Sequence, residues 1–544
     1  MNDWIQSLRI HADLAAGRAL AEHDANPYSP TVGCFDRRYW AWKLVDFPEA
    51  TFQRLVLPLA LLYRDPRSRF HHQPEVLSAI RSGMSYAGRI QHANGSFDQA
   101  FPFEQSYGAT AFLLYPLLEA AHLIDEHLDP DERIRVHHTC RRAAEFLCAH
   151  AERHGVIANH LAGAAFALAT AADTFAERPF DDAATEIVNF LIDSQSAEGW
   201  FPEYDGADPG YQTLCIDYLS AYAARRPSAR LDTALQQAVL FLQWFVHPDG
   251  TFGGIYGSRR TSVVYLAGLA RLAPAMPVAG AMFETLATTM ARADSVAPSA
   301  VDVGNLAPLL TSTVSALALA QGGLGVAAEL PMAAAGARAD FPRAGLFIRS
   351  TPEHYAVVGV ANGGTVTVFS RSTKRLVLDD GGYVAEYADG KRITTQATRP
   401  DRAASLDGAA IEVDVPFVRM ARTLPTPVRF GMLRVLNLTL MRSIAIGNWV
   451  KRRLVGLLMA DHGEVPLRLK RRIVVDGGVQ IIDRIENPTA VALKWMTGGR
   501  PFSSIHMASA GYAQGGRLGT ERPASIVDVE KLARDRAVEL TTRL

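Results

Sequence analysis

The sequence predicts an N-terminal (α/α) toroid followed by a C-terminal antiparallel β-sandwich, and three observations lead to this prediction. From Met1 to about Gly336, apolar residues recur at the helical spacing of three and four, and short loops rich in Gly, Pro and Asp separate the segments. A loop motif repeats within this helical part. After Phe341 the pattern changes to short segments rich in Val, Phe and Tyr, separated by Asn-Gly and Asp-Gly turns, which is typical of antiparallel strands.

The repeated loop motif indicates how the helices are arranged. Residues 91–110, 194–213 and 247–261 each carry a Gly-aromatic turn, a polar loop, and a Tyr or Arg shortly before a Thr that opens an apolar helix; residues 154–163 are a weaker copy. The glycines of the four copies, at positions 95, 155, 199 and 250, are 60, 44 and 51 residues apart, about the length of two helices with their loops. Helical hairpins of this period can close into a ring whose loops form a bowl at one end.

The strand pattern sets the remaining domain boundaries. We expect the toroid in residues 1–320, a Gly- and Ala-rich linker in 321–340, the antiparallel β-sandwich in 341–520 and a C-terminal helix within 521–544, running from about 526 to 540. The expected strands are residues 345–349, 354–360, 364–369, 375–378, 467–475 and 478–485.

Composition excludes several classes of protein. The chain has 544 residues, 48% of them hydrophobic, which is enough for two or more cores. Its formal net charge is -1, so no global attraction to nucleic acid is expected. The four cysteines are scattered without a CxxC pair, which argues against a disulfide scaffold or a cysteine zinc site. A terpene cyclase is disfavoured because no DxDD or DDxxD motif is present in a suitable loop.

One segment within the β region is basic and apolar. Residues 430–459 carry Arg434, Arg442 and the run 451–453 (Lys-Arg-Arg) but no acidic residue. Such a segment can be an amphipathic element on an anionic membrane face, which would make the membrane a peripheral partner. The alternative, which we favour, is an excursion of the β domain that packs on the toroid.

A few residues in the repeat loops link this architecture to a family. Asn159 and His160 stand in the sequence ANHLAG, and Tyr204 and Tyr211 follow that His by 44 and 51 residues. With the toroid and the sandwich, these residues make the chain resemble the heparinase II/III-like proteins and the wider group of toroid-plus-sandwich polysaccharide lyases. The resemblance implies that Asn159, His160 and Tyr211 carry out a β-elimination at a uronic acid, with Tyr204 competing for the tyrosine role. The implied function is cleavage of an acidic, uronate-containing polysaccharide or oligosaccharide.

The chemistry of β-elimination explains why these residue types are needed. The uronate carboxylate must be neutralised before the C5 proton can leave, and an amide such as Asn159 or Gln212, or a cation such as Arg260, can do this. His160 or an ionised tyrosine can take the proton, and Tyr211 can return one to the leaving oxygen. No cofactor or metal is required. The resemblance implies a His-rich, metal-binding segment in the sandwich of many members, but the corresponding residues 362–383 contain no histidine, so zinc is not expected.

Structural roles explain the same residues without catalysis. Asn159 and His160 can cap and start a helix, because Asn is a favoured N-cap residue. Tyr211 and Tyr107 occupy equivalent positions of the repeat, so both can pack an inner helix. The basic pair at 259–260 can attract an acidic sugar or can pair with the aspartates at 205 and 208.

Other residues are expected to bind substrate. The segment 34–53 combines aromatic and basic side chains suited to stacking on sugars and binding carboxylate; buried, it would instead be an amphipathic helix that closes the toroid. From this segment and from the repeat loops we expect the following residues to bind substrate: Arg38, Trp40, Trp42, Lys43, Glu104, Gln105, Tyr107, Gln212, Tyr256 and Arg259.

Two other functions remain open. A glycoside hydrolase would use carboxylates of the same bowl, among Glu104, Asp205 and Asp208, and a separation of about 6.5–9.5 Å would support inversion. A non-catalytic protein would bind a glycan or a lipid-linked precursor during polysaccharide synthesis. No secretory signal is recognisable at the N-terminus, so we expect a cytoplasmic location, with a peripheral position on the inner membrane face as an extension. The oligomeric state is left open.

Overall fold

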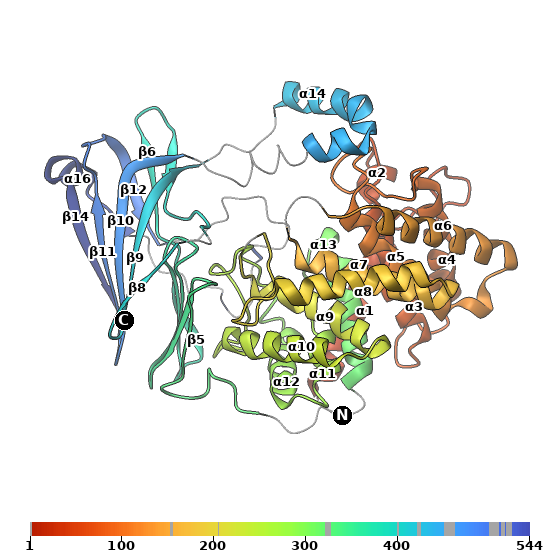
Figure 1. The fold of residues 1–544 in the computed structure, drawn as a ribbon, viewed down its shortest axis with the longest axis horizontal. Helices are drawn as coiled ribbons and strands as arrows, with labels where there is room; N and C mark the ends of the chain where they lie inside the picture. The colour runs from red at the N-terminus through yellow and green to blue at the C-terminus, as the bar shows by residue number, and fades with distance from the viewer. Residues whose placement is uncertain are drawn as a thin grey trace.

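The computed structural model describes residues 3–152, 156–204, 206–320, 328–399, 402–420, 426–450, 463–499, 511–512, 517 and 525–544. A helical domain is followed by two antiparallel sheets, and the five-stranded sheet lies between the helices and the second sheet (Figure 1). The predicted fold class, a helical toroid followed by an antiparallel β-sandwich, is confirmed.

Inner helices form a closed ring. Within the described residues they are α3 (Val56–Arg64), α5 (Tyr107–Leu123), α7 (Ala158–Phe175), α9 (Pro209–Arg225), α11 (Ala267–Leu272) and α13 (Val303–Leu319). Each contacts the next, and α13 contacts α3, which closes the ring. α5 and α7 are buried along most of their length, which explains why both are apolar on all sides instead of amphipathic.

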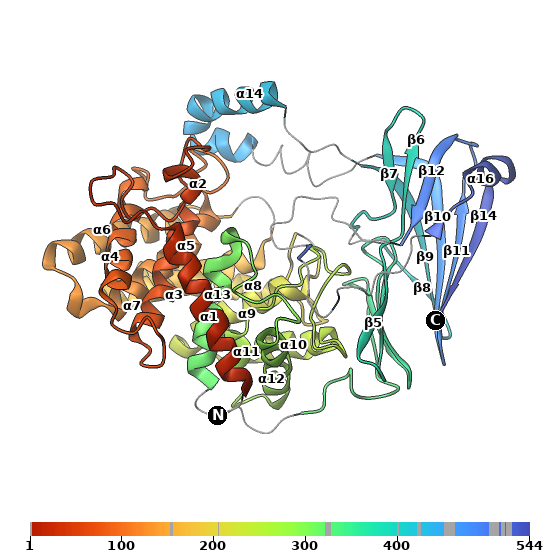
Figure 2. The same ribbon diagram turned by 180° about the vertical axis from the view of Figure 1, so that it is seen from behind.

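Outer helices surround the ring. They are α1 (Asp3–Glu22), α4 (Pro74–Ile90), α6 (Pro130–Ala149), α8 (Arg178–Ser194), α10 (Ala229–Leu242) and α12 (Pro277–Ala291). α8 buries one stripe at spacings of four and three, formed by Phe180, Ala184, Val188 and Leu191. Figure 2 shows α1 beside α13, so the N-terminal helix completes the outer layer next to the last inner helix.

The repeated glycines hold each loop against an outer helix. Gly95 and Gly199 have φ of 89° and 95°, in the left-handed region. A Cβ at Gly95 would lie 2.1 Å from the carbonyl oxygen of Arg142 in α6, and one at Gly199 would lie 2.4 Å from that of Gln237 in α10. The repeat therefore has a structural cause, because only glycine permits both the turn and this close approach.

The first sheet is a five-stranded antiparallel meander. It contains β1 (Arg338–Phe341), β2 (Leu346–Ser350), β3 (His354–Gly359), β4 (Thr365–Ser370) and β5 (Arg375–Asp380), paired in chain order. Side chains of one face, such as Ile348 and Tyr355, join the core of the toroid, and those of the other face, such as Phe347 and Val358, join the core between the sheets. Burial on both faces explains the continuous apolar pattern of β2, β3 and β4.

The second sheet covers the outer face of the first. Its strands are β6 (Tyr383–Tyr387), β7 (Arg392–Thr394), β8 (Ser405–Asp407), β9 (Ala410–Arg419), β10 (Glu464–Val475), β11 (Val479–Glu486), β12 (Leu493–Gly498), β13 (Ser525–Ile526) and β14 (Ala537–Arg543). The order is β13-β12-β6-β7-β9-β10-β11-β14, with β8 paired to β9. β10 alternates buried and exposed residues, as expected for a sheet with one solvated face. The six strands expected from sequence are all present as β2 to β5, β10 and β11.

The expected C-terminal helix is wrong in extent. α16 spans only Val529–Asp535, and Arg536 (φ 62°) ends it in the left-handed region. The chain then forms β14, which pairs with β11 from Ala537 to Arg543. The alternation of Val538 and Leu540 with polar residues fits this strand, and the edge of β11 provides its partner.

The basic segment between β9 and β10 leaves the sheet. α14 (Pro427–Leu438) and a 3₁₀ turn (Leu440–Arg442) lie over the toroid near α2 (Arg37–Trp40), away from the sheets (Figure 1). Of the predicted segment 430–459, residues 430–450 are described and residues 451–459 lie outside the described residues; Arg434 in α14 pairs with Asp46 of the toroid, as the favoured alternative expects. The linker expected at 321–340 is described from residue 328; α13 ends at Leu319 and β1 begins at Arg338.

Polar contacts fix the toroid on the first sheet. The hydroxyl of Tyr355 donates to the carbonyl oxygen of Trp244 at 2.6 Å, and Nδ2 of Asn362 donates to the carbonyl oxygen of Gly257 at 2.9 Å. Gly257 lies in the last repeat loop and Trp244 just before it, so the end of the toroid that carries the repeat loops faces the sheet.

Candidate functional site

Three repeat loops meet in front of the inner helices. The N–H of Ala158 donates to the carbonyl of Pro202 at 3.1 Å, and the N–H of Tyr204 donates to that of Val156 at 3.2 Å. The N–H of Ser258 donates to the carbonyl of Ala207 at 2.8 Å. These bonds bring the start of α7, the loop before α9 and the last repeat loop into one cluster, which we call the loop site.

A buried amide and carboxylate form the floor of the loop site. Nδ2 of Asn159 donates to Oε2 of Glu203 at 2.8 Å, and both side chains are buried. Burial raises the pKa of Glu203 to about 7, although Arg259, His160 and the bond from Asn159 act in the opposite direction. Glu203 therefore exchanges a proton near neutral pH.

His160 is held from three sides and stays partly exposed. Its Nδ1 lies 3.0 Å from Oε2 of Glu152, and its ring meets that of Phe112 edge-on at 5.0 Å. The third contact is with the backbone of α5, since a Cβ on Gly108 would lie only 2.6 Å from Nδ1. The orientation of His160 is thus fixed by packing as well as by hydrogen bonding.

Arg259 lies beside two tyrosine rings. Its guanidinium carbon is 4.4 Å from the ring centroid of Tyr204 and 5.6 Å from that of Tyr211. Burial disfavours its charge, but the neighbouring Tyr211 and Glu203 raise its pKa, so it remains a cation. Its Nε is buried and has no hydrogen-bond partner within the described part of the chain. A cation with a free donor therefore stands among groups suited to proton transfer.

The two tyrosines differ in backbone setting. Tyr204 has φ of 53° in a loop, a strained conformation for a non-glycine residue that is common at functional sites. Burial raises its pKa, and Arg259 partly offsets this. Tyr211 stands in the first turn of α9, where its N–H donates to the capping carboxylate of Asp208 at 3.0 Å.

Arg260 turns away from its neighbour Arg259. It is buried and donates from Nη2 to the carbonyl oxygen of Gln396, just after β7, at 2.5 Å. Burial lowers its pKa to about 10. The structure therefore does not bring Arg260 to the tyrosines as expected for a catalytic cation, and Arg259 occupies that place instead.

Comparison with known proteins agrees with this architecture. Residues 53–268 match the family model described as the ulvan lyase N-terminal domain. The structure is similar to a chondroitin AC lyase from Streptomyces coelicolor A3, with 13% identity and a TM-score of 0.57 over 91% of this chain and 68% of that one. It is also similar to heparinase III, with 11% identity and a TM-score of 0.52 over 88% of this chain and 71% of that one.

A third similar structure is a Paenibacillus xanthan lyase, with 9% identity and a TM-score of 0.50 over 92% of this chain. The chain spans about half of that enzyme, 51% of its length. No curated protein sequence matches this chain. The chain shares the fold of these polysaccharide lyases, a helical toroid followed by antiparallel sheets. The predicted resemblance to this group is confirmed in fold, and the matched model covers the inner helices from α3 to the start of α11.

Several side chains expected to bind substrate are buried or form hydrogen bonds within the protein. Gln212 is buried and donates from Nε2 to the carbonyl oxygen of Ala238 at 3.2 Å. The hydroxyl of the buried Tyr256 lies 2.7 Å from Nε2 of His247. Tyr107 is buried at the start of α5, and Oε2 of Glu104 accepts from the N–H of Ala100 at 2.6 Å. Gln212, Tyr256 and Glu104 thus form hydrogen bonds within the protein, whereas Tyr107 also lines a cavity with Glu152 and Val156.

Polar groups of the aromatic segment near α2 bond within the N-terminal part of the toroid. Nε1 of Trp40 donates to the carbonyl of Glu22 at 2.7 Å, and Arg38 pairs with Asp36 and Glu49. The polar groups of Trp40 and Arg38 therefore already have partners within the protein. Trp42 and Lys43 are exposed. Gln105 bridges to the excursion, donating from Nε2 to the carbonyl of Arg442 at 3.0 Å.

Two residues of the loop site were missed by the sequence reasoning. Glu203 precedes Tyr204 in the repeat loop, and its position beside a candidate tyrosine was the available signal. Glu152 lies at the end of the loop after α6, and no motif marked it before its contact with His160 was known. Together they supply the carboxylates that hold Asn159 and His160.

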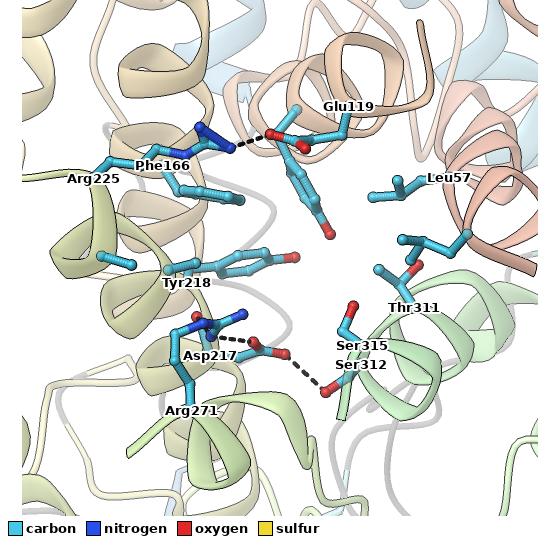
Figure 3. Close-up of a pocket in the computed structure, with 14 residues that line it drawn as sticks. Leu57, Glu119, Phe166, Asp217, Tyr218, Arg225, Arg271, Thr311, Ser312 and Ser315 are labelled. Carbon is cyan, nitrogen blue, oxygen red and sulfur yellow. Dashed lines mark hydrogen bonds and ion pairs between the residues drawn. The ribbon is translucent and has the colours of Figure 1, made fainter. Parts of the chain in front are cut away.

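A separate cavity lies inside the ring, toward the ends of the inner helices remote from the loop site. It encloses about 320 Å³ and is bordered by Tyr115, Phe166 and Tyr218 (Figure 3). Its charged groups compensate one another: Arg225 pairs with Glu119, Arg271 with Asp217, and Ser312 donates to Asp217 at 2.8 Å. The cavity contains none of the residues predicted to be catalytic.

Proposed function

We propose that this chain cleaves an acidic, uronate-containing polysaccharide or oligosaccharide by β-elimination at the loop site. The observation that carries the proposal is the placement of Arg259 against Tyr204 and Tyr211, beside the Asn159–Glu203 pair and His160. This site contains a cation, two phenols and an imidazole. These are the groups that elimination requires, and the reaction needs no metal.

Arg259 neutralises the uronate carboxylate in this proposal. A guanidinium binds a carboxylate through paired donors, and the low dielectric of a half-buried site strengthens that interaction as negative charge spreads from C5. The unpartnered Nε of Arg259 supports this role. The role was first expected of Arg260, whose guanidinium donates to Gln396 in the β domain.

Tyr211 transfers the proton, with Tyr204 as the competing residue. An ionised phenol removes the proton from C5, the C–H electron pair forms the C4–C5 double bond, and the C4–O bond breaks. The leaving oxygen then takes a proton from the phenol or from His160. A nearby cation favours the phenolate that starts this sequence. The cap from Asp208 fixes the backbone of Tyr211, which supports it over Tyr204 in the loop.

Asn159 acts through its neighbours. Its side chain is buried and bonded to Glu203, so we assign it a positioning role, in which it orients Glu203 beneath Arg259. Glu152 likewise orients His160, which is partly exposed and can touch the substrate. The Asn159–Glu203 and Glu152–His160 pairs hold the polar groups of the site in fixed orientations, and such preorganisation is what transition-state stabilisation requires.

The test is the ultraviolet absorbance of the unsaturated product during incubation with a panel of uronate polymers and oligosaccharides. Wild type should produce a rise, and Tyr211→Phe and His160→Ala should each reduce the rate by about 100-fold or more. Tyr204→Phe serves as the matched comparison. If Tyr204→Phe abolishes the rise and Tyr211→Phe does not, the tyrosine assignment is reversed; if no polymer gives a rise, the lyase proposal fails.

The hydrolase alternative has less support. Both oxygens of Asp208 accept backbone N–H groups, from Tyr211 at 3.0 Å and from Arg259 at 2.8 Å, and Glu104 accepts from its own loop. Asp205, the third carboxylate of that alternative, lies outside the described residues. A non-catalytic glycan-binding role would become the preferred function if binding persisted without any product.

The identity of the sugar and the cellular location are further parts of the proposal. Chondroitin, xanthan and heparin are named for the similar enzymes and indicate an acidic glycan as substrate class. No helix within the described residues is long and apolar enough to cross a membrane. We propose a cytoplasmic location and no nucleic-acid partner.

A further inference from the structure

In the excursion between β9 and β10, polar side chains face the toroid and several apolar side chains are exposed. Arg434, Asn437 and Met441 follow one another at spacings of three and four and face the toroid. Arg434 pairs with Asp46 at 2.9 Å, and Asn437 and Met441 are buried. The stripe at Val428, Met432 and Val435 is exposed instead. Two of the three inward residues are therefore polar, and the outward stripe is apolar.

The apolar exposure continues beyond α14 and onto the neighbouring loop. Leu440 and Trp449 are exposed, as are Trp42 and Leu44 on the loop that carries Asp46. Met432 and Val435 keep 63% and 64% of their surface accessible. We call residues 427–450 together with 42–44 the apolar rim. Several large apolar side chains exposed on neighbouring segments of the surface indicate an interaction site.

The charge of the apolar rim identifies the kind of partner. Residues 427–450 contain three arginines and no acidic residue; Arg434 is paired with Asp46, whereas Arg429, Arg442 and the nearby Lys43 are exposed cations. Apolar side chains between cations, with tryptophans at the edge, fit the headgroup region of an anionic bilayer.

We propose that the apolar rim docks this protein on the surface of an anionic lipid bilayer. This inference goes beyond the lyase proposal and does not depend on it. The rim also touches the first repeat loop, because the guanidinium carbon of Arg442 lies 4.7 Å from the ring centroid of Phe103 and Gln105 bonds to the carbonyl of Arg442. That loop leads into α5, whose Gly108 contacts His160, so docking would bring the loop site near the membrane.

Vesicle flotation tests the inference. The full-length protein should float with vesicles of phosphatidylcholine and phosphatidylglycerol and not with phosphatidylcholine alone. The double variant Met432→Glu/Val435→Glu should lower the partition coefficient by at least about tenfold, because two apolar side chains leave the bilayer. Arg429→Gln should lower it by about fivefold at low salt. Ile134→Glu on α6 is the matched control, since Ile134 is 66% exposed outside the rim, and should float as wild type does.

Three outcomes would overturn the inference. The first is wild type that does not prefer anionic vesicles. The second is equal loss of flotation in Ile134→Glu and the double variant. The third is a wild-type dimer, detected by light scattering, that the double variant converts to monomer without any change in flotation; the rim would then join two copies of this chain. Unchanged melting temperatures show that the variants fold.

Discussion

Asn159 donates a hydrogen bond from Nδ2 to Oε2 of Glu203 at 2.8 Å, and this bond joins the first turn of α7 to the loop before α9. It connects the residue pair on which the family resemblance depended to a carboxylate that the resemblance did not include. Because Glu203 also lies near Arg259, the bond links the two halves of the loop site. The pKa of Glu203 therefore reports on whether the two halves of the loop site are joined as described.

Replacement of Glu203 by Gln should change how stability depends on pH. Burial raises the pKa of Glu203 from an ordinary 4.5 to about 7, so the folded protein binds the proton more tightly than the unfolded chain does. This stabilisation is fully present below pH 4.5 and is lost as pH rises through 7. Relative to Glu203→Gln, wild type should lose on the order of 3 kcal/mol over this range.

Denaturant titrations of both proteins from pH 4.5 to 8 measure this difference. Parallel pH profiles for wild type and Glu203→Gln would show that Glu203 has an ordinary pKa, and the buried-pair description of the loop site would be wrong.

Substitution of Arg259 should lower activity, and substitution of the adjacent Arg260 should lower stability. Arg259→Lys keeps the positive charge but loses the paired guanidinium N–H donors that bind a carboxylate. We therefore expect kcat/KM to fall by about 100-fold with little change in melting temperature. Arg260→Lys should cost about 1–3 kcal/mol of stability because a buried bond to Gln396 is lost, with kcat nearly unchanged. Steady-state kinetics and thermal melts check both, and the reverse pattern would return the catalytic role to Arg260.

A methyl group added at Gly108 should displace His160. The new Cβ would lie 2.6 Å from Nδ1 and 2.8 Å from Cε1 of the imidazole, a clash that the ring can relieve only by moving. Gly108→Ala should therefore lower kcat by about tenfold or more, since a shift of about 1 Å in a catalytic group has effects of this size. Gly431→Ala is a suitable control, because no atom lies within 4 Å of its added Cβ in α14. Equal activity of the two variants would argue against His160 as a catalytic group.

Asp208 should matter for folding. Its carboxylate accepts the N–H groups of Tyr211 and Arg259 and so fixes both the start of α9 and the last repeat loop. Asp208→Ala should destabilise the protein by about 2 kcal/mol or more, as expected for the loss of a buried cap that leaves donors unpaired. Full stability with complete loss of activity in Asp208→Asn would instead revive the hydrolase alternative.

The architecture was predictable because its signals are local and repeated. Helical spacing marked the inner and outer helices, and the glycines at 95 and 199 were visible because each must adopt a positive φ against the next outer helix. The strands of the first sheet were visible as continuous apolar runs, since both faces are buried. The C-terminal helix was overestimated, because the pairing of β14 with β11 depends on a strand about 50 residues earlier in the chain.

The loop site was predictable in part. Position in the repeat pointed to Asn159, His160, Tyr204 and Tyr211, all of which lie in or beside the clustered loops. Which arginine faces the tyrosines was not predictable, because Arg260 has φ of 54° and its side chain reaches the β domain while Arg259 faces the site. Gln212 and Tyr256 were named from the same loops, but their burial depends on tertiary packing that the sequence does not reveal.

Cleavage of a uronate oligosaccharide in water enriched in heavy oxygen distinguishes elimination from hydrolysis at the loop site. Elimination adds no water to the products, so mass spectrometry should find no heavy oxygen in either fragment, and one fragment should absorb in the ultraviolet and be lighter than its hydrolytic counterpart by one water. Arg259→Lys should form both fragments at least about 100-fold more slowly. One heavy oxygen in one of the two fragments, with no ultraviolet absorbance in either, would contradict elimination, because it would show hydrolysis at this site.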